Sequence, residues 1–305
     1  MAKIRTVLGD ISPVALGVTN CHDHIYCRPP KFWTDKNPDL LLVDLEKSIQ
    51  EMNFFKESGG QSFVDASTID YGHDLRALKT VSERTGVHII ATTGFNKDRF
   101  VESWVYQKPI EEVVEMVAKE ITEGAQGTNV QCGIVKGGSM YNQISPIADR
   151  LLRIAARVHR MTGAPISTHT EMGTMGLEQL DIFDQEGVDL TRVCIGHCDL
   201  NPDPWYAKAI AARGAFVGID SVGKVKYHPD SQRGEVLHAL VNAGYVKQVL
   251  LGMDIGRQSD SKAYQGGIGH GWLLSRFIPR LRAEGFPDEV LNCFLVENPK
   301  RWLTF

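Results

Sequence analysis

Six side chains that can bind or bridge metal ions close short apolar runs in this sequence. They are His22, His24, Lys136, His169, His197 and Asp254. Alternate side chains of a strand point to the same face, so His22 and His24 can reach one ion together. Imidazole and carboxylate ligands suit Zn, Mn, Co, Fe or Ni better than Ca or Mg. The pattern therefore predicts a site for a transition-type metal.

Lys136 separates the kinds of metal chemistry that this site could carry out. An ammonium group cannot ligate a cation, and burying it beside one is costly. Either Lys136 is an ordinary loop lysine whose head group reaches water, or it has reacted with CO₂. In the second case its carbamate would bridge two metal ions, and Asp254 and a bridging hydroxide would help to offset their charge. We therefore take a metal-dependent hydrolase as the first hypothesis.

These side chains need a scaffold that brings several strand ends together. Apolar, β-branched runs alternate with amphipathic stretches, as expected for repeated βα units. Eight expected strands end near His24, Asp65, Thr92, Lys136, His169, His197, Asp220 and Asp254. Expected helices include 42–58, 110–123, 148–162, 177–185, 204–213, 234–243 and 287–294. The prediction is one domain over residues 1–305, a (β/α)₈ TIM barrel whose strand ends share one mouth.

Two further segments complete this prediction. Residues 4–18 are expected to form a small hairpin before the first barrel strand, with Gly9-Asp10 at its turn. Residues 256–272 form the longest unassigned stretch, and long loops on a barrel are often functional.

Composition excludes several other classes of protein. A net charge of −4 gives no support for nucleic-acid binding, which usually needs a basic face. No stretch has the length and apolarity of a membrane span, and six cysteines in 305 residues do not indicate a disulfide framework. We expect a cytoplasmic protein. Cys194 and Cys198 flank His197 without standing two residues from it, so we predict that they are packing residues.

Several motifs give the chain a family resemblance. They are Cys-His-Asp-His-Ile (21–25), Gly-Ile-Val-Lys (133–136), Thr-Gly-Ala-Pro-Ile-Ser-Thr-His-Thr (162–170), Arg-Val-Cys-Ile-Gly-His (192–197), Gly-Tyr-Val-Lys-Gln (244–248) and Met-Asp (253–254). Together, in this order, they make the chain resemble the phosphotriesterase-like branch of the amidohydrolase superfamily over essentially its full length.

The resemblance implies two divalent metal ions, with zinc expected first. It implies His22, His24 and Asp254 on a buried ion and His169 and His197 on a more exposed one. Carboxylated Lys136 and a hydroxide would bridge the two. Some relatives carry Glu at this position, so Lys136 places the chain among the carbamate-using members.

Two adjacent ions can hold hydroxide at neutral pH and polarise a carbonyl or phosphoryl oxygen. In the family mechanism the aspartate of the buried metal accepts the hydroxide's proton, which assigns this catalytic role to Asp254. Asp220, after the seventh strand, either continues the proton path or serves as a loop cap or ion-pair partner.

The expected loops carry basic and aromatic groups that could bind substrate. We predict substrate contacts from Lys97, Lys224, Lys226, Arg257, Lys262 and Tyr264. Barrel enzymes often bind phosphate beside strands seven and eight, and Arg and Lys are its natural partners. These groups favour a small anionic substrate, and the alternative is that they only keep the rim soluble. Tyr264 lies seven residues after Arg257, whereas the sugar-phosphate lactonase branch would have a tighter Arg and Tyr cluster.

The first hypothesis is thus a binuclear lactonase acting on a sugar-derived lactone, with a phosphorylated one as the more specific form. A phosphotriesterase or acyl-homoserine-lactone hydrolase of the same family is the alternative. A mononuclear deaminase would not need Lys136, and a non-catalytic binding barrel would not need a poised hydroxide. The resemblance is compatible with a homodimer, although the sequence indicates no interface.

Overall fold

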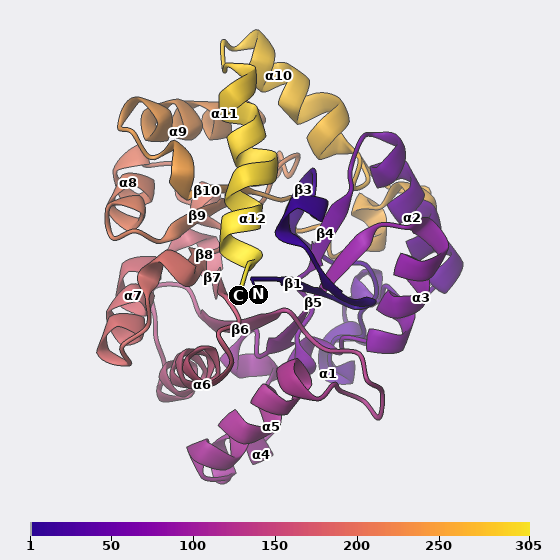
Figure 1. Cartoon of the computed structure of the whole chain (residues 1–305), viewed down its shortest axis with the longest axis vertical. Helices are drawn as coiled ribbons and strands as arrows, with labels where there is room; N and C mark the ends of the chain where they lie inside the picture. Colours follow the sequence, from indigo (N-terminus) through magenta and orange to yellow (C-terminus); the bar gives the residue numbers. More distant parts are fainter. Residues whose placement is uncertain (1) are drawn as a thin grey trace.

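The barrel predicted from the sequence is confirmed in a computed structural model, which describes residues 2–305 (Figure 1). Eight parallel strands follow one another around it in chain order. They are β3 (Thr19–Asp23), β4 (Ser62–Asp65), β5 (His88–Gly94), β6 (Ile134–Ser139), β7 (Ile166–Thr170), β8 (Val193–Ile195), β9 (Phe216–Ile219) and β10 (Val249–Leu251). The backbone N–H groups of Met253 and Asp254 donate to the carbonyl of His22 at 3.1 and 3.0 Å. These bonds join the last strand to the first and close the ring.

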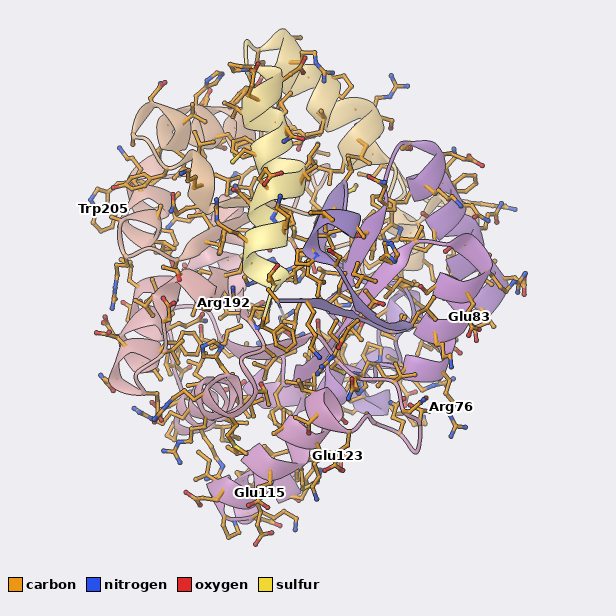
Figure 2. All side chains as sticks on the ribbon, viewed as in Figure 1. Arg76, Glu83, Glu115, Glu123, Arg192 and Trp205 are labelled. Carbon is orange, nitrogen blue, oxygen red and sulfur yellow. The ribbon has the colours of Figure 1, made fainter. Side chains whose placement is uncertain are left out.

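Helices surround the strands and turn their charged side chains outward, as Glu83 on α3 and Glu115 on α5 do in Figure 2. The outer helices are α1 (Lys31–Thr34), α2 (Leu45–Glu57), α3 (Leu75–Thr85), α4 (Trp104–Gln107), α5 (Ile110–Thr122), α6 (Pro146–Thr162), α7 (Gly176–Gln185), α8 (Pro204–Ala212), α9 (Asp230–Asn242), α10 (Ile278–Ala283), α11 (Asp288–Asn292) and α12 (Asn298–Leu303). Within residues 2–305, no helix combines the length and apolarity needed to cross a bilayer.

The predicted boundaries need small corrections. The helix expected over 42–58 begins at Leu45, because Leu42 pairs with Cys27 and Asp44 caps the helix by accepting the N–H of Lys47 at 3.2 Å. The helix expected from residue 234 begins at Asp230, directly after Pro229. The expected final helix is longer than 287–294, since α11 continues through a π-helical turn at 293–297 into α12.

The N-terminal hairpin is shorter than predicted. β1 (Ile4–Thr6) and β2 (Gly9–Ile11) pair as expected, but a 3-10 turn occupies residues 13–15, where Pro13 cannot continue a strand ladder. The two ends of the chain meet at the amino ends of the barrel strands, where Lys3 and Phe305 exchange two backbone hydrogen bonds (Figure 1). Hairpin and α12 therefore close one end of the barrel.

The barrel interior near that end is a packed apolar cluster. Its buried members are Ile4, Leu16, Cys21, Val64, Ile90, Ile134, Cys194, Phe216, Leu250, Trp302 and Leu303. Cys194 is thus a packing residue, as predicted, and Cys198 is buried in the outer core. With one end filled by apolar side chains, polar groups can collect only toward the carboxyl ends of the strands.

Candidate active site

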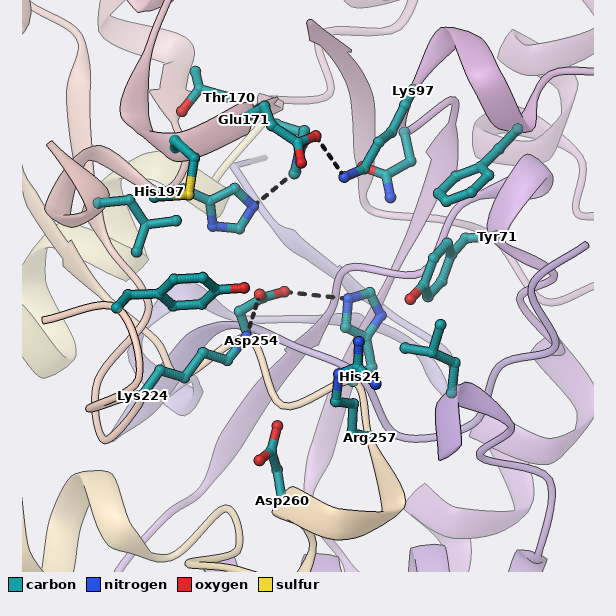
Figure 3. A pocket seen from close by; sticks show the side chains of 18 of the residues that line it. His24, Tyr71, Lys97, Thr170, Glu171, His197, Lys224, Asp254, Arg257 and Asp260 are labelled. Atoms are coloured by element: carbon teal, nitrogen blue, oxygen red, sulfur yellow. Dashed lines mark hydrogen bonds and ion pairs between the residues drawn. The ribbon is translucent and has the colours of Figure 1, made fainter. Parts of the chain in front are cut away.

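The carboxyl ends of the strands open into a cavity of about 230 Å³. His24, Lys136, His169, His197 and Asp254 all line it, and Figure 3 labels His24, His197 and Asp254 among them. Five of the six predicted metal-site residues therefore face one space. His22, the sixth, lies behind His24 and Lys136 in contact with both Asp254 and Lys136.

His22, His24 and Asp254 form one group of ligand atoms. His22 lies in β3 and His24 directly follows its last residue, while Asp254 follows β10 with a left-handed φ of 50°. Its Oδ1 lies 3.7 Å from Nε2 of His22 and 3.4 Å from Nε2 of His24. One donor atom from each lies within 4.8 Å of the other two, so these three residues could hold a single ion.

Lys136 is buried at the centre of the site. It lies inside β6 rather than at its end, because that strand runs on to Ser139. Nζ is 3.4 Å from Nε2 of His22 and 3.4 Å from the carbonyl of Ala66, and the side chain makes no ion pair within the described residues. Burial lowers the pKa of Lys136, which increases the share of neutral amine at a given pH.

His169 and His197 form the second part of the cluster. Nε2 of His197 lies 2.9 Å from Nδ1 of His169. Burial, reinforced by nearby Lys97, lowers the pKa of His169 well below its usual value. Nε2 of His169 is buried and has no hydrogen-bond partner among residues 2–305. A neutral imidazole is the form that ligates metals, and Nδ1 of His169 and Nε2 of His197 are the two nitrogens that face each other.

Asp220 connects these two groups from behind. Its Oδ1 lies 2.8 Å from Nδ1 of His197, and its Oδ2 lies 3.0 Å from Nδ1 of His22. Burial alone would raise the pKa of Asp220, but the neighbouring rings of His197 and His22 outweigh it and hold this pKa far below the usual range. An ionised carboxylate therefore faces both rings, in agreement with the ion-pair alternative for Asp220.

The donor set fits a divalent cation with nitrogen and oxygen ligands. His22, His24 and Asp254 form one such group. His22, His197 and Asp220 also lie close enough together, but there Asp220 contacts the Nδ1 atoms on the outer side of the two rings. Both His22 and His24 have Nδ1 occupied: Nδ1 of His22 contacts Asp220, and Nδ1 of His24 lies 2.8 Å from the Ser67 hydroxyl. Such outer contacts are typical of metal-binding histidines, because they fix the ring and its tautomer.

Two predicted substrate-binding lysines lie at the cavity but are paired with carboxylates. Lys224 forms an ion pair with Asp254, and Nζ of Lys97 lies 2.9 Å from Oε2 of Glu171 (Figure 3). Burial would lower the pKa of Lys224, but Asp254 outweighs it and raises this pKa.

Among the other predicted contacts, Lys226 and Arg257 also line the cavity. The structure places Lys262 and Tyr264 outside it. Lys262 is exposed, with Nζ 4.3 Å from the centre of the Phe54 ring on α2, and the Tyr264 hydroxyl accepts the N–H of Asp44 at 3.3 Å. Their loop turns back onto α2, a direction that the sequence does not indicate.

Glu171, Asn96 and Asp260 line the cavity and were not among the predicted site residues. The sequence could have indicated Glu171, because it stands two residues after His169 and so continues the same face of the chain. His270 is buried behind His22 and His24 and contacts both Asp23 (3.5 Å) and Glu51 (3.0 Å).

Comparison with known proteins agrees with this geometry. Residues 2–303 match the family model described as the phosphotriesterase family. A phospho-furanose lactonase of Mycoplasmopsis synoviae is 34% identical over 99% of this chain and 91% of its own. The crystal structure of a lactonase from Listeria monocytogenes superposes with a TM-score of 0.96 at 37% identity, covering 99% of both chains. A phosphotriesterase homology protein of Escherichia coli, solved with phosphate in its active site, gives a TM-score of 0.91 at 35% identity over 96% of this chain and all of its own.

Proposed function

Because this chain is a hydrolase that belongs to the phosphotriesterase family, we propose that it is a binuclear metal-dependent lactonase. Its substrate would be a sugar-derived lactone that carries an anionic group such as a phosphate. The observation that carries the proposal is the convergence of four histidines, Asp254 and buried Lys136 at one barrel mouth.

In this proposal His22, His24 and Asp254 would hold a buried ion, and His169 and His197 would hold a more exposed one. Lys136 would contribute as a carbamate, formed when its neutral amine attacks CO₂ and releases a proton. The contacts of Lys136 support this, because a buried ammonium without a carboxylate partner beside two metal ions would be strongly unfavourable. Zinc is the first expectation, with Mn, Co, Fe or Ni as alternatives. When bound, the ions would supply hydroxide at neutral pH and polarise the carbonyl.

Asp254 is the proposed acceptor of the proton released on attack. Its carboxylate lies at the cavity and is ionised: burial would raise its pKa, but Lys224 and His197 outweigh that effect and lower it well below the usual value. The ion pair with Lys224 holds Asp254 in place. Asp220 acts behind the site by orienting His22 and His197.

The anionic substrate is inferred from charges on one side of the cavity. Lys224, Lys226 and Arg257 line it there, against a single further carboxylate, Asp260, besides Asp254. Arg257 is partly held by Asp39 at 3.4 Å and keeps about a third of its side chain exposed. The E. coli relative with phosphate in its active site and the phospho-furanose lactonase support the same choice.

The alternatives are less well supported. A neutral aryl triester or a long acyl chain would favour an apolar pocket, whereas this one is lined by many charged groups. In a mononuclear deaminase Lys136 would have no role. In a non-catalytic binding module the whole set of proposed metal ligands would have no role. A homodimer and a cytoplasmic location stay predictions.

The proposal is tested by metal analysis together with hydrolysis of a small lactone panel, with and without a 5-phosphate. Two ions per chain and a preference for the phosphorylated lactone would support it. Two ions without that preference would still agree with a metal-dependent hydrolase but would refute the anion-binding roles of Lys224 and Arg257. One ion or none, with no lactone opened, would refute the carbamate and favour the deaminase or the binding module.

A further inference from the structure

The side of the cavity across from Lys224 carries polar groups that the hydrolytic mechanism does not use (Figure 3). Glu171 follows β7, and its Oε2 lies 3.5 Å from Nε2 of His169 and 2.9 Å from Nζ of Lys97. Among residues 2–305 both of these contacts go to Oε2, so Oε1 remains available as an acceptor.

Asn96 adds a second, independent indication that a ligand binds on this side. Its side chain is only 6% exposed, and Oδ1 is buried without a hydrogen-bond partner in the described part of the chain. The residue is held firmly, because its backbone N–H donates to both carboxylate oxygens of Asp70 at 2.8 and 3.0 Å. Buried polar atoms normally have partners, and Asn96 lines the cavity, so a bound molecule is the natural source of one.

The charge balance on this side does not favour an anion. Lys97 is neutralised by Glu171, unlike the excess of basic groups around Lys224, Lys226 and Arg257. A paired carboxylate and ammonium, with an amide beside them, offer both acceptors and donors at fixed positions. That combination suits the hydroxyl groups of a sugar, each of which donates one hydrogen bond and accepts others.

We propose that Glu171, with Lys97 and Asn96, recognises the hydroxyl group on the carbon next to the lactone carbonyl. This inference rests on the proposed lactonase function. Glu171 stands beside His169, so a carbonyl held at His169 would bring the neighbouring carbon closest to Glu171. The cavity would then have two ends, one selecting for the anionic group and one for the 2-hydroxyl. Glu171 is a specificity residue in this scheme.

The test compares a sugar 1,4-lactone with its 2-deoxy counterpart, both carrying the same 5-substituent. In the wild type, kcat/KM should be higher for the hydroxylated lactone. Glu171→Met has a similar length but no acceptor, and we expect it to reduce this preference about tenfold, since hydrogen bonds to charged groups are the stronger ones. Glu171→Gln retains an acceptor and should keep part of the preference. The 2-deoxy lactone should be hydrolysed almost equally by all three proteins.

Asp260→Asn is the matched control, because it removes a carboxylate from the same cavity on the Arg257 side. It should leave the preference for the 2-hydroxyl unchanged. Metal content per chain, measured for every variant, separates recognition of substrate from damage to the ligand His169. Equal losses on both lactones, or an unchanged preference in Glu171→Met, would overturn the inference while leaving the lactonase intact. A wild type that opens neither lactone would instead overturn the proposed function.

Discussion

Asp220 accepts two hydrogen bonds from His197, one from ring Nδ1 at 2.8 Å and one from its backbone N–H at 2.9 Å. His197 has a left-handed φ of 58°, so this double contact fixes both an uncommon backbone and the ring that it carries. With Nδ1 donating to Asp220, Nε2 is the nitrogen turned to the cavity. Asp220 thus sets which atom of His197 can bind an ion.

We therefore expect Asp220→Asn to weaken metal binding by about 10- to 100-fold, the usual cost of losing such an outer partner. Titration with a chelator of known affinity measures this, and Asp184→Asn, an exposed carboxylate on α7, is the control. Unchanged affinity with a large loss of kcat would instead assign Asp220 to the proton path.

Replacing Lys136 tests the bridged site. Lys136→Ala should lower the metal content from two ions per chain and remove several kcal/mol of transition-state stabilisation, a loss of rate on the order of 10³-fold. Lys79→Ala, on the exposed face of α3, should retain both properties. Full activity in Lys136→Ala would contradict the carbamate and support a mononuclear enzyme.

The anion-binding role of Lys224 predicts a change in preference between substrates. Lys224→Met should lower kcat/KM for a phosphorylated lactone about tenfold more than for its unphosphorylated counterpart, because a charge-assisted contact is lost. Any change common to both substrates reflects the ion pair with Asp254. Lys262→Met, outside the cavity, is the control, and an equal effect on both substrates in Lys224→Met would refute the role.

A buried ion pair behind the site should dominate local stability. Nε of Arg233 lies 2.6 Å from Oδ2 of Asp199, and neither side chain is exposed. Asp199 also accepts the backbone N–H groups of Asp220 and Ser221, both at 3.2 Å. Arg233→Met leaves this carboxylate buried without its main cation, and we expect the free energy of unfolding to fall by about 3–5 kcal/mol.

Urea unfolding measures that loss as a shift in midpoint. Adding Asp199→Asn to Arg233→Met removes the unpaired charge while keeping an acceptor, and should recover part of the stability. A double variant less stable than Arg233→Met would contradict the explanation by an uncompensated charge.

The buried His270 should make stability depend on pH. Burial would lower the pKa of His270, but Asp23 and Glu51 outweigh it and raise this pKa to about 9. Because the folded-state pKa lies above the ordinary 6.5, the folded protein binds the proton more tightly. The stabilisation is present below about pH 6.5 and is lost as pH rises through about 9.

We therefore expect the wild type to exceed His270→Gln in stability by the largest margin near pH 6 and by much less near pH 10. Urea midpoints at several pH values measure this difference. A margin that grows with pH would show that His270 is neutral in the folded protein.

Much of the scaffold, and the set of side chains that gathers at its mouth, could be predicted because the responsible signals are local. The alternation of His22 and His24 is a property of one strand, and the order of βα units fixes which strand ends share a mouth. Helix ends also depend on local residues: Gly163 adopts a left-handed φ of 78° directly after α6, a conformation that commonly ends a helix.

Only the tertiary structure decided how charges pair across the mouth. Lys97 meets Glu171 and Lys224 meets Asp254 because different strands deliver these residues to one cavity. The loop at 256–272 turns toward Asp39 and Glu51, more than two hundred residues away in the chain. Such contacts depend on side-chain positions set by the whole fold, whereas strand and helix periodicity depends on neighbours in the chain. For that reason the sequence could indicate which residues gather at the barrel mouth, and the structure showed which residues surround them.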